Sequence, residues 1–240
     1  MAPPSLVLLH GFTQTGRSWE PVVAALAERY RALAPDVRGH GDASALTPVT
    51  LDAVIDDVAA GAPATFTLVG YSMGGRIALH AALALRSRVE RLVLIGASPG
   101  IADPAARAAR RVADEQLADE LERSTIEEFA RRWAVTPVLS GQSPTVAAAA
   151  HADRLRSSPD GLARALRGLG TATLPPLWER LGELQMQVTL VTGERDEKFT
   201  AIATQMADAI PAAAVSIVAG AGHAVHLEAP ARLAELLVGV

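Results

Sequence analysis

The stretch that decides the fold is residues 66–75, which read FTLVGYSMGG. Its first half is a short apolar run typical of a buried strand, and the residues that follow have the spacing of an amphipathic helix. Between them, residues 70–74 form the pattern G-x-S-x-G around Ser72. A serine at a sharp strand-to-helix turn needs glycine two residues before and after it, because side chains there would clash. The stretch therefore predicts a nucleophile elbow.

Working outward, short Val- and Leu-rich runs recur along the chain without the alternation of a half-solvated strand, so each predicts a strand buried on both faces. Amphipathic helical stretches separate several of them. Strand, helix and strand in succession predict right-handed crossovers and a mostly parallel sheet. The expected strands are 5–9, 31–34, 66–69, 91–95, 188–191 and 215–218, and the expected helices are 19–29, 51–60, 75–85 and 202–209.

This alternation breaks between residues 99 and 176, where Ala-, Arg- and Glu-rich segments lack any clear strand. Prolines punctuate the region into short helices. Helices that follow a strand's carboxyl end lie at the edge of an α/β sheet where ligands bind. We therefore expect one α/β domain spanning 1–240, with a core of 1–98 and 177–240 and a helical lid at 99–176.

Composition excludes several classes of protein. Of the 240 residues, 50% are hydrophobic and 20% charged, which indicates a globular chain. The net charge of -4 argues against nucleic acid or an anionic membrane as partner, and no apolar run is long enough to span a bilayer. The N-terminus lacks signal-peptide features, so we expect a cytoplasmic protein. Without cysteine, a disulfide framework, a thiolate metal site and a cysteine nucleophile are all excluded.

A serine nucleophile or base requires a histidine to accept its proton and an acid to orient that histidine, and after an elbow the chain order is Ser, acid, His. Asp196 follows one predicted strand and His223 follows the next, each at the strand's carboxyl end. Glu194 is the rival acid, and we prefer Asp196. Five other histidines fit packing or loop-shaping roles better: His10, His40, His80, His151 and His226.

The loop after the first strand reads His10-Gly11-Phe12. Its backbone N–H at Phe12 is placed to pair with the N–H of Met73, the residue after the serine, as an oxyanion hole. The role belongs to the amides, and the Phe12 side chain fits core packing equally well.

Together with the elbow, DVRGHG at 36–41, GERD at 193–196 and GHAVHLEAP at 222–230 resemble the α/β-hydrolase superfamily. The resemblance covers the whole chain and implies that superfamily's fold. It departs in one respect, because the HGF motif begins at residue 10 and leaves room for a single preceding strand. The leading β-hairpin common in the superfamily is therefore expected to be missing.

Narrower motifs resemble one branch, the 2-succinyl-6-hydroxy-2,4-cyclohexadiene-1-carboxylate synthases of menaquinone biosynthesis. They are GYSMGGR at 70–76, SPGI at 98–101, the arginine-rich 107–111, PLWERL at 176–181 and GERDEKF at 193–199. The resemblance implies a lyase that eliminates pyruvate from 2-succinyl-5-enolpyruvyl-6-hydroxy-3-cyclohexene-1-carboxylate. Its triad then abstracts a proton and forms no acyl-enzyme, and neither a metal nor an organic cofactor is needed.

The resemblance also implies a carboxylate-binding wall of Arg76, Arg110 and Trp133, with the phenol of Tyr71 and added positive charge from Lys198. Bidentate guanidinium pairing suits carboxylates. A surface ion pair for Arg76, lid packing for Trp133 and a solvated loop for Lys198 are the structural alternatives. The sequence does not distinguish Arg110 from Arg107 and Arg111, which flank it.

Two rival functions follow from the same residues. The triad would also serve an esterase, a lactonase or a carbon–carbon bond hydrolase, although a cavity for neutral substrates would make Arg76 and the lid arginines a desolvation burden. A non-catalytic binding module of this fold would not need Ser72, Asp196 and His223 together. We expect a small anionic carboxylate as substrate, and a monomer or small homo-oligomer.

Overall fold

The computed structural model describes residues 3–238, which build one six-stranded parallel sheet in the order β2-β1-β3-β4-β5-β6. It confirms the expected α/β class and a single strand before the HGF loop. The strands are β1 (Ser5–Leu9), β2 (Arg31–Leu33), β3 (Phe66–Tyr71), β4 (Val89–Ile95), β5 (Gln187–Gly193) and β6 (Ala213–Val218). Their carboxyl ends share one edge, so loops distant in sequence meet there.

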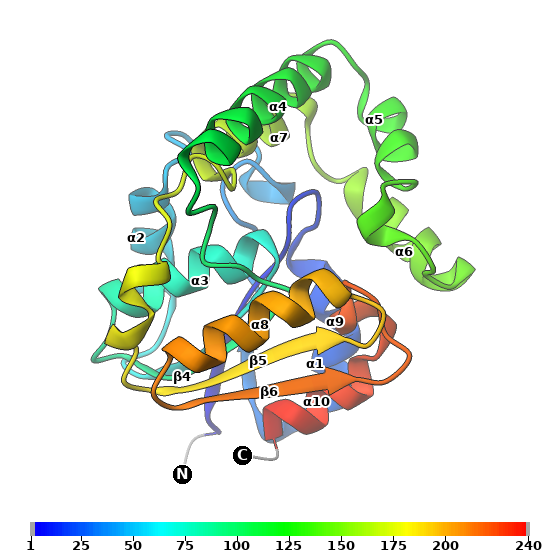
Figure 1. Cartoon of the computed structure of the whole chain (residues 1–240). Coiled ribbons are helices and arrows are strands. Elements are labelled where there is room, and N and C mark those ends of the chain that lie inside the picture. Colours follow the sequence, from blue (N-terminus) through cyan, green and yellow to red (C-terminus); the bar gives the residue numbers. More distant parts are fainter. Residues whose placement is uncertain (1–2, 239–240) are drawn as a thin grey trace.

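Helices cover both faces of the sheet (Figure 1). Apolar side chains of α1 (Glu20–Leu26), α9 (Val225–Glu228) and α10 (Pro230–Val238) form the core on one face. Those of α2 (Leu51–Gly61), α3 (Met73–Ala84) and α8 (Glu197–Ala209) form the core on the other. The central β3 therefore carries the elbow into the middle of the carboxyl edge, and the core on both of its faces holds the elbow in place.

The outer strands correct one sequence prediction. Strands β1, β3, β4 and β5 are largely buried on both faces as expected, whereas β2 and β6 are not. In β6, Val215 is 36% exposed and Ile217 is 56% exposed. Each of these two strands has a neighbour on one side only, and the flanking helices leave part of its surface in solvent.

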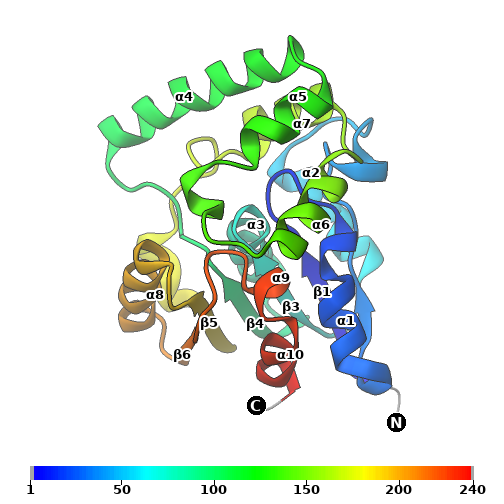
Figure 2. The ribbon, with the colours of Figure 1, turned by 90° about the vertical axis from the view of Figure 1, so that its right-hand side faces the viewer.

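Between β4 and β5 the chain forms helices above the carboxyl edge (Figures 1 and 2). Short helices were expected, but α4 has 19 residues. The prolines explain the difference, because three of them begin helices at a position where the missing N–H costs nothing. The helices are α4 (Pro104–Glu122), α5 (Ile126–Trp133), α6 (Pro144–Arg154) and α7 (Pro159–Leu169), with short 3₁₀ turns Pro137–Leu139 and Trp178–Glu183. We call residues 99–176 the lid.

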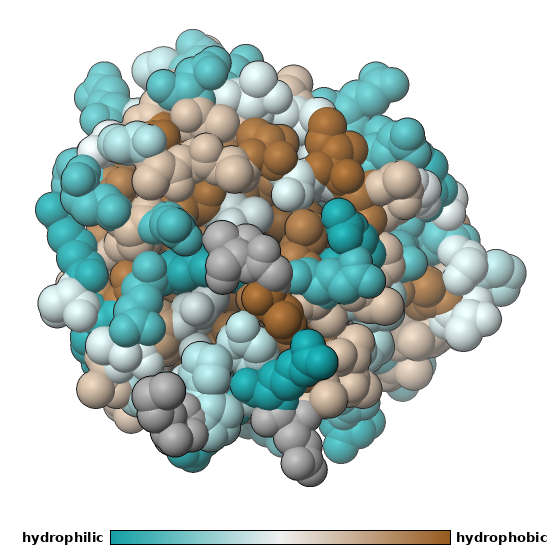
Figure 3. All heavy atoms as spheres, turned by 90° about the horizontal axis from the view of Figure 1, so that it is seen from below, coloured by the Kyte–Doolittle hydropathy of each residue, from teal (hydrophilic) through white to brown (hydrophobic). Residues whose placement is uncertain are grey.

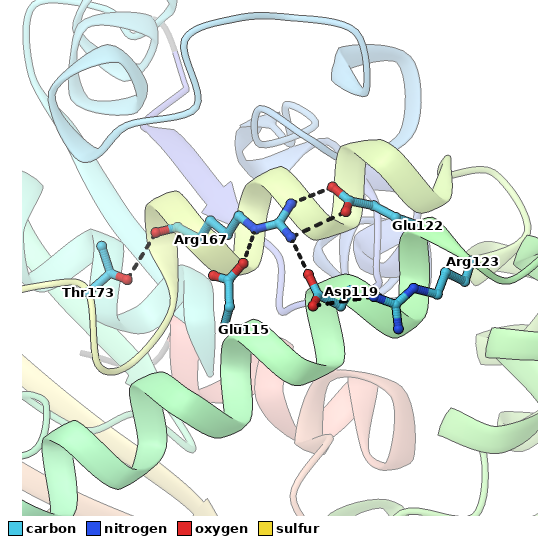
Figure 4. A network of polar contacts seen from close by, with 6 residues as sticks. All are labelled: Glu115, Asp119, Glu122, Arg123, Arg167 and Thr173. Carbon is cyan, nitrogen blue, oxygen red and sulfur yellow. Dashed lines mark hydrogen bonds and ion pairs between the residues drawn. The ribbon is translucent and has the colours of Figure 1, made fainter.

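Arg167 of α7 connects that helix to α4 (Figure 4). Its guanidinium donates to Glu115 at 2.7 Å, to Asp119 at 2.9 Å and to Glu122, all on α4. Hydrogen bonds to Glu122 and Glu115 raise the pKa of Arg167 above its ordinary value. The pair of helices α4 and α7 is therefore joined by a fully partnered cation.

The face opposite the lid mixes hydrophilic and hydrophobic residues (Figure 3). Within residues 3–238, no helix combines the length and the apolar character that crossing a bilayer requires.

Candidate active site

The elbow sits between β3 and α3, and Ser72 has φ 51° and ψ -109°. This backbone conformation is strained for a residue with a side chain, and it turns the serine away from the sheet. A Cβ at Gly70 would overlap the Gly74 and Gly75 backbone, and a Cβ at Gly74 would overlap the backbone of Leu9. The two glycines of the motif are thus required by close backbone approach.

Three side chains from three different loops meet at this turn. The His223 Nδ1–H donates to Asp196 Oδ2 at 2.6 Å, and His223 Nε2 lies 3.2 Å from Ser72 Oγ. Because an ionised carboxylate only accepts, it fixes the proton on Nδ1 and leaves Nε2 free to accept from the serine. The imidazole is 5% exposed and the carboxylate 9%, so their hydrogen bond is shielded from water.

The rival acid lies elsewhere. Glu194 is exposed, and its carboxylate accepts from the Gly220 amide at 2.8 Å. Asp196 also accepts from Phe199 N with its other oxygen and so caps α8. The helix thereby fixes the carboxylate that faces His223.

Two backbone amides beside Ser72 are available to a ligand. Met73 is the first residue of α3, so its N–H has no partner within the helix. Among the described residues, neither this N–H nor that of Phe12 donates to another protein group. The α3 N-terminus adds a favourable dipole for an anion at this position.

A cavity of about 410 Å³ opens beside Ser72, between the sheet edge and the lid. Its volume is within the range of small-molecule sites. None of the described residues lining it is acidic, whereas three are basic: Arg76, Arg110 and Lys198. Phe12, Met73, Trp133 and His223 also line it. The cavity is therefore suited to an anion.

Arg76 does not fit the structural alternative of a surface ion pair, because it is 8% exposed. Helix α3 is buried around nearly its whole circumference, and its apolar sequence IALHAALA is the signal that could have shown this. No carboxylate whose side chain the structure describes forms an ion pair with Arg76, and the Arg76 Nε has no hydrogen-bond partner. Burial and nearby Arg110 lower the pKa of Arg76 to about 10.

The three lid arginines are distinguished by their partners. Arg107 donates to the carbonyls of 172–174, and Arg111 donates to the Ala172 carbonyl. Both therefore hold the end of the lid. Arg110 lines the cavity, and only its Nε is engaged, with Asp114 at 2.7 Å. Its two terminal nitrogens make no hydrogen bond to another described residue and are free to meet a ligand.

Tyr71 departs from its expected place on the cavity wall. It is 4% exposed and absent from the cavity lining, and its ring lies 4.2 Å from that of His226 and 5.2 Å from that of His223. Alternation along β3 explains this: Tyr71 points to the same face as Val69, away from the face of Leu68. Burial raises the pKa of the Tyr71 phenol above its ordinary value.

Trp133 and Lys198 both line the cavity. The indole of Trp133 packs edge-on against Phe12 with ring centroids 5.3 Å apart, so it contacts lid and core at once. Lys198 is exposed, with its ammonium 5.5 Å from the Phe199 ring centroid.

Two further histidines, His10 and His226, lie behind the site and contact its supporting loops. His10 accepts from the Val37 N–H at 2.9 Å, and His226 Nε2 donates to Gln14 Oε1, which also accepts from the Gly11 amide. Burial lowers the pKa of His226 to about 3, so it stays neutral. Gln14 is a site neighbour that sequence reasoning missed, because a polar loop residue carries no sequence signal of its contact. No cluster of potential metal ligands occurs within residues 3–238.

Comparison with known proteins gives the family. Residues 6–236 match the Alpha/beta hydrolase family. The chain is 34% identical to a putative 2-succinyl-6-hydroxy-2,4-cyclohexadiene-1-carboxylate synthase of Bacillus subtilis, over 95% of this chain and 87% of that protein. It is 33% identical to the synthase of that name from Salmonella paratyphi C, over 99% and 93%.

Among solved structures, MenH from S. aureus superposes with a TM-score of 0.92 at 31% identity, covering 98% of this chain and 92% of that one. The chain therefore belongs to the α/β-hydrolase family of enzymes and is similar over nearly its whole length to the members named 2-succinyl-6-hydroxy-2,4-cyclohexadiene-1-carboxylate synthase.

Proposed function

We propose that this chain eliminates pyruvate from 2-succinyl-5-enolpyruvyl-6-hydroxy-3-cyclohexene-1-carboxylate and so acts as a carbon–oxygen lyase of menaquinone biosynthesis. The relatives that carry the synthase name support this reaction, since they align along almost the whole chain. The content of the cavity supports it independently, as argued below.

The names of substrate and product define the bonds that change. A proton leaves C2, beside the succinyl carbonyl, and a double bond forms between C2 and C3. The ring double bond moves from C3=C4 to C4=C5, and the C5–O bond breaks. Enolpyruvate departs with that electron pair and takes up a proton to become pyruvate. The step needs a base at C2 and stabilisation of the charge that develops on the succinyl oxygen.

The described geometry supplies both. Ser72 Oγ is the base that takes the C2 proton, and His223, held by Asp196, accepts the serine proton in turn. The free amides of Phe12 and Met73 donate to the enolate oxygen. Because the donors are fixed backbone groups, they need little rearrangement during the step.

The charges of the cavity match those of the substrate. The substrate name contains three carboxylates: one on the ring, one in the succinyl chain and one in the enolpyruvyl group. The three basic residues Arg76, Arg110 and Lys198 line the cavity without an acidic neighbour in its wall. A cavity for neutral esters would gain nothing from these cations, because their desolvation would not be compensated.

The single observation that carries the proposal is the buried guanidinium of Arg76, unpaired and in the same cavity as Ser72. The test is to incubate the protein with the cyclohexene intermediate and follow pyruvate release, beside a panel of p-nitrophenyl esters. We expect pyruvate release that Ser72→Ala abolishes, with little ester turnover. Rapid ester hydrolysis without pyruvate release would contradict the lyase assignment.

A further inference from the structure

Glu228 is a buried carboxylate that the proposed mechanism does not use. It ends α9, and its side chain is 7% exposed. Its Oε2 accepts from the Gly222 amide at 2.8 Å, and its Oε1 accepts from the Ala224 amide at 3.2 Å. These amides belong to the residues on either side of His223. The carboxylate thus holds the backbone of the loop that carries the imidazole.

Arg195 connects this carboxylate to the lid. One terminal nitrogen, Nη2, donates to Glu228 Oε2 at 2.6 Å, and the other, Nη1, donates to the Gly141 carbonyl at 2.8 Å. Gly141 lies in the lid between the Pro137–Leu139 turn and α6. The Arg195 side chain is 43% exposed while that of Glu228 is buried, so the ion pair is shielded on its inner side.

We infer that the Gly141 carbonyl, the Arg195 guanidinium and the Glu228 carboxylate form a latch, in which Glu228 positions His223 and Arg195 makes that position depend on the docking of the lid. The inference rests on the proposed role of His223 as the group that accepts the serine proton. Glu228 and Arg195 are positioning residues, because neither lines the cavity or contacts Ser72.

Close packing makes the latch sensitive to small displacements. A Cβ at Gly222 would lie only 3.1 Å from Glu228 Oε1, so the loop and the carboxylate are in tight contact. His223 Nε2 is already 3.2 Å from Ser72 Oγ, and a shift of about 1 Å can cost about 10²-fold in rate. Loss of the anion should therefore lower kcat while leaving substrate binding unchanged.

The lid end of the latch can be removed without touching the site. Gly141 has φ +79°, and a Cβ there would overlap Arg195 Nη1. Gly141→Ala therefore breaks the lid contact from one side, and Arg195→Ala breaks it from the other. Arg232→Ala is the matched control, because it removes an arginine whose exposed ion pair with Glu235, at 2.7 Å, includes no group of the latch.

The experiment compares Glu228→Gln, Glu228→Ala, Arg195→Ala and Gly141→Ala with the control. The first readout is the downfield proton NMR signal of the His223 Nδ1–H, assigned by its loss in His223→Ala and independent of turnover. The second is the kinetics of pyruvate release. We expect Glu228→Ala to broaden or shift the signal and lower kcat at least about tenfold, with KM changed less than about twofold. Arg195→Ala and Gly141→Ala should show about threefold to tenfold losses, and Glu228→Gln should retain more activity than Glu228→Ala.

The NMR readout separates failure of the latch from failure of the proposed function. Absence of pyruvate release in the wild type would overturn the lyase assignment, and the signal would still report whether His223 is held by Glu228. An unchanged signal and unchanged kcat in Arg195→Ala and Gly141→Ala would overturn the latch. These two variants decide the matter even where Glu228→Ala does not fold.

Discussion

Two arginines occupy opposite electrostatic situations in this molecule. Arg167, in the lid, forms ion pairs with three carboxylates of α4, and two of them, Glu122 and Glu115, raise its pKa (Figure 4). Arg76, which lines the cavity, is buried without an ion pair to a described carboxylate, and burial lowers its pKa to about 10. The paired cation holds two helices together. The unpaired cation contributes nothing comparable to the fold, and its position is explained by a ligand that brings its own negative charge.

Nearby charges do not offset the free-energy cost of burying the charged Arg76 guanidinium. Asp114 favours the charged guanidinium, but its Oδ1 already accepts from Arg110, and Arg110 opposes the charge of Arg76. With a pKa of about 10, Arg76 remains protonated at neutral pH. The buried Arg76 guanidinium is thus a source of local instability, a feature that proteins tend to retain at functional sites.

The largest effects on activity should come from substitutions in the proposed triad. Ser72→Ala or His223→Ala should lower kcat for pyruvate release by about 10² to 10⁴, because each removes the proton transfer. Melting temperatures should change little, since neither side chain is part of the two cores. Steady-state kinetics and thermal unfolding of the two variants check this, and full activity in either would exclude the triad from the mechanism.

Asp196→Asn should also reduce kcat strongly, since it loses the charge and proton acceptor that orient His223 at 2.6 Å. Glu194→Gln is its matched control, because among the described residues the Glu194 carboxylate accepts a hydrogen bond from the exposed Gly220 amide and not from His223. Comparison of the two kcat values makes the test. If Glu194→Gln lowers kcat more than Asp196→Asn does, the catalytic acid has been assigned to the wrong residue.

Arg76→Ala should lower kcat/KM by at least about 30-fold, because a substrate carboxylate would then be desolvated without a partner. Arg76→Lys should restore only part of the loss, since an ammonium lacks the planar fork of donors. The kcat/KM of the two variants with the cyclohexene intermediate provides the measurement. Equal kcat/KM values for Arg76→Ala and wild type would show that Arg76 does not bind a substrate carboxylate.

The smallest effect on activity should come from the lid. Arg167→Ala should leave kcat/KM within about threefold and lower the melting temperature by about 2 to 4 °C, since it removes a network of partly exposed ion pairs. The loss should shrink at high salt, which screens these pairs. Thermal unfolding at two salt concentrations measures both effects. A large loss of kcat/KM with an unchanged melting temperature would show that Arg167 serves activity and not the stability of the fold.

The elbow and the pairing of Asp196 with His223 could be predicted because each residue follows a strand, and carboxyl ends of parallel strands converge. Contacts across the lid could not be predicted in this way. The sequence does not show that Arg107 donates to the carbonyls of 172–174 whereas Arg110 lines the cavity. Both residues lie on one helix, and their spacing does not determine which side of that helix faces the cavity. The Arg195–Glu228 pair likewise joins two residues that are 33 positions apart in the sequence.

The sequence already contained signals against the expected place of Tyr71 and against the surface alternative for Arg76. Tyr71 is two residues after Val69 on β3, so strand alternation already places its ring away from the cavity. The nearly continuous apolar composition of α3 predicts a helix buried on all sides, and hence a buried Arg76. In both cases the position of the side chain follows from the pattern of the strand or helix and not from the catalytic motif.

The most direct test of a carboxylate site at Arg76 is thermal unfolding of wild type and Arg76→Met, each with and without saturating 2-succinyl-6-hydroxy-2,4-cyclohexadiene-1-carboxylate. Burial lowers the pKa of Arg76 from 12.5 to about 10, so its protonated form destabilises the fold at every pH below about 10. We predict that unliganded Arg76→Met melts higher than wild type at pH 7.5, and that the ligand raises the melting temperature of wild type much more than that of the variant. A lower melting temperature for Arg76→Met, with an equal ligand-induced rise in both proteins, would contradict the account.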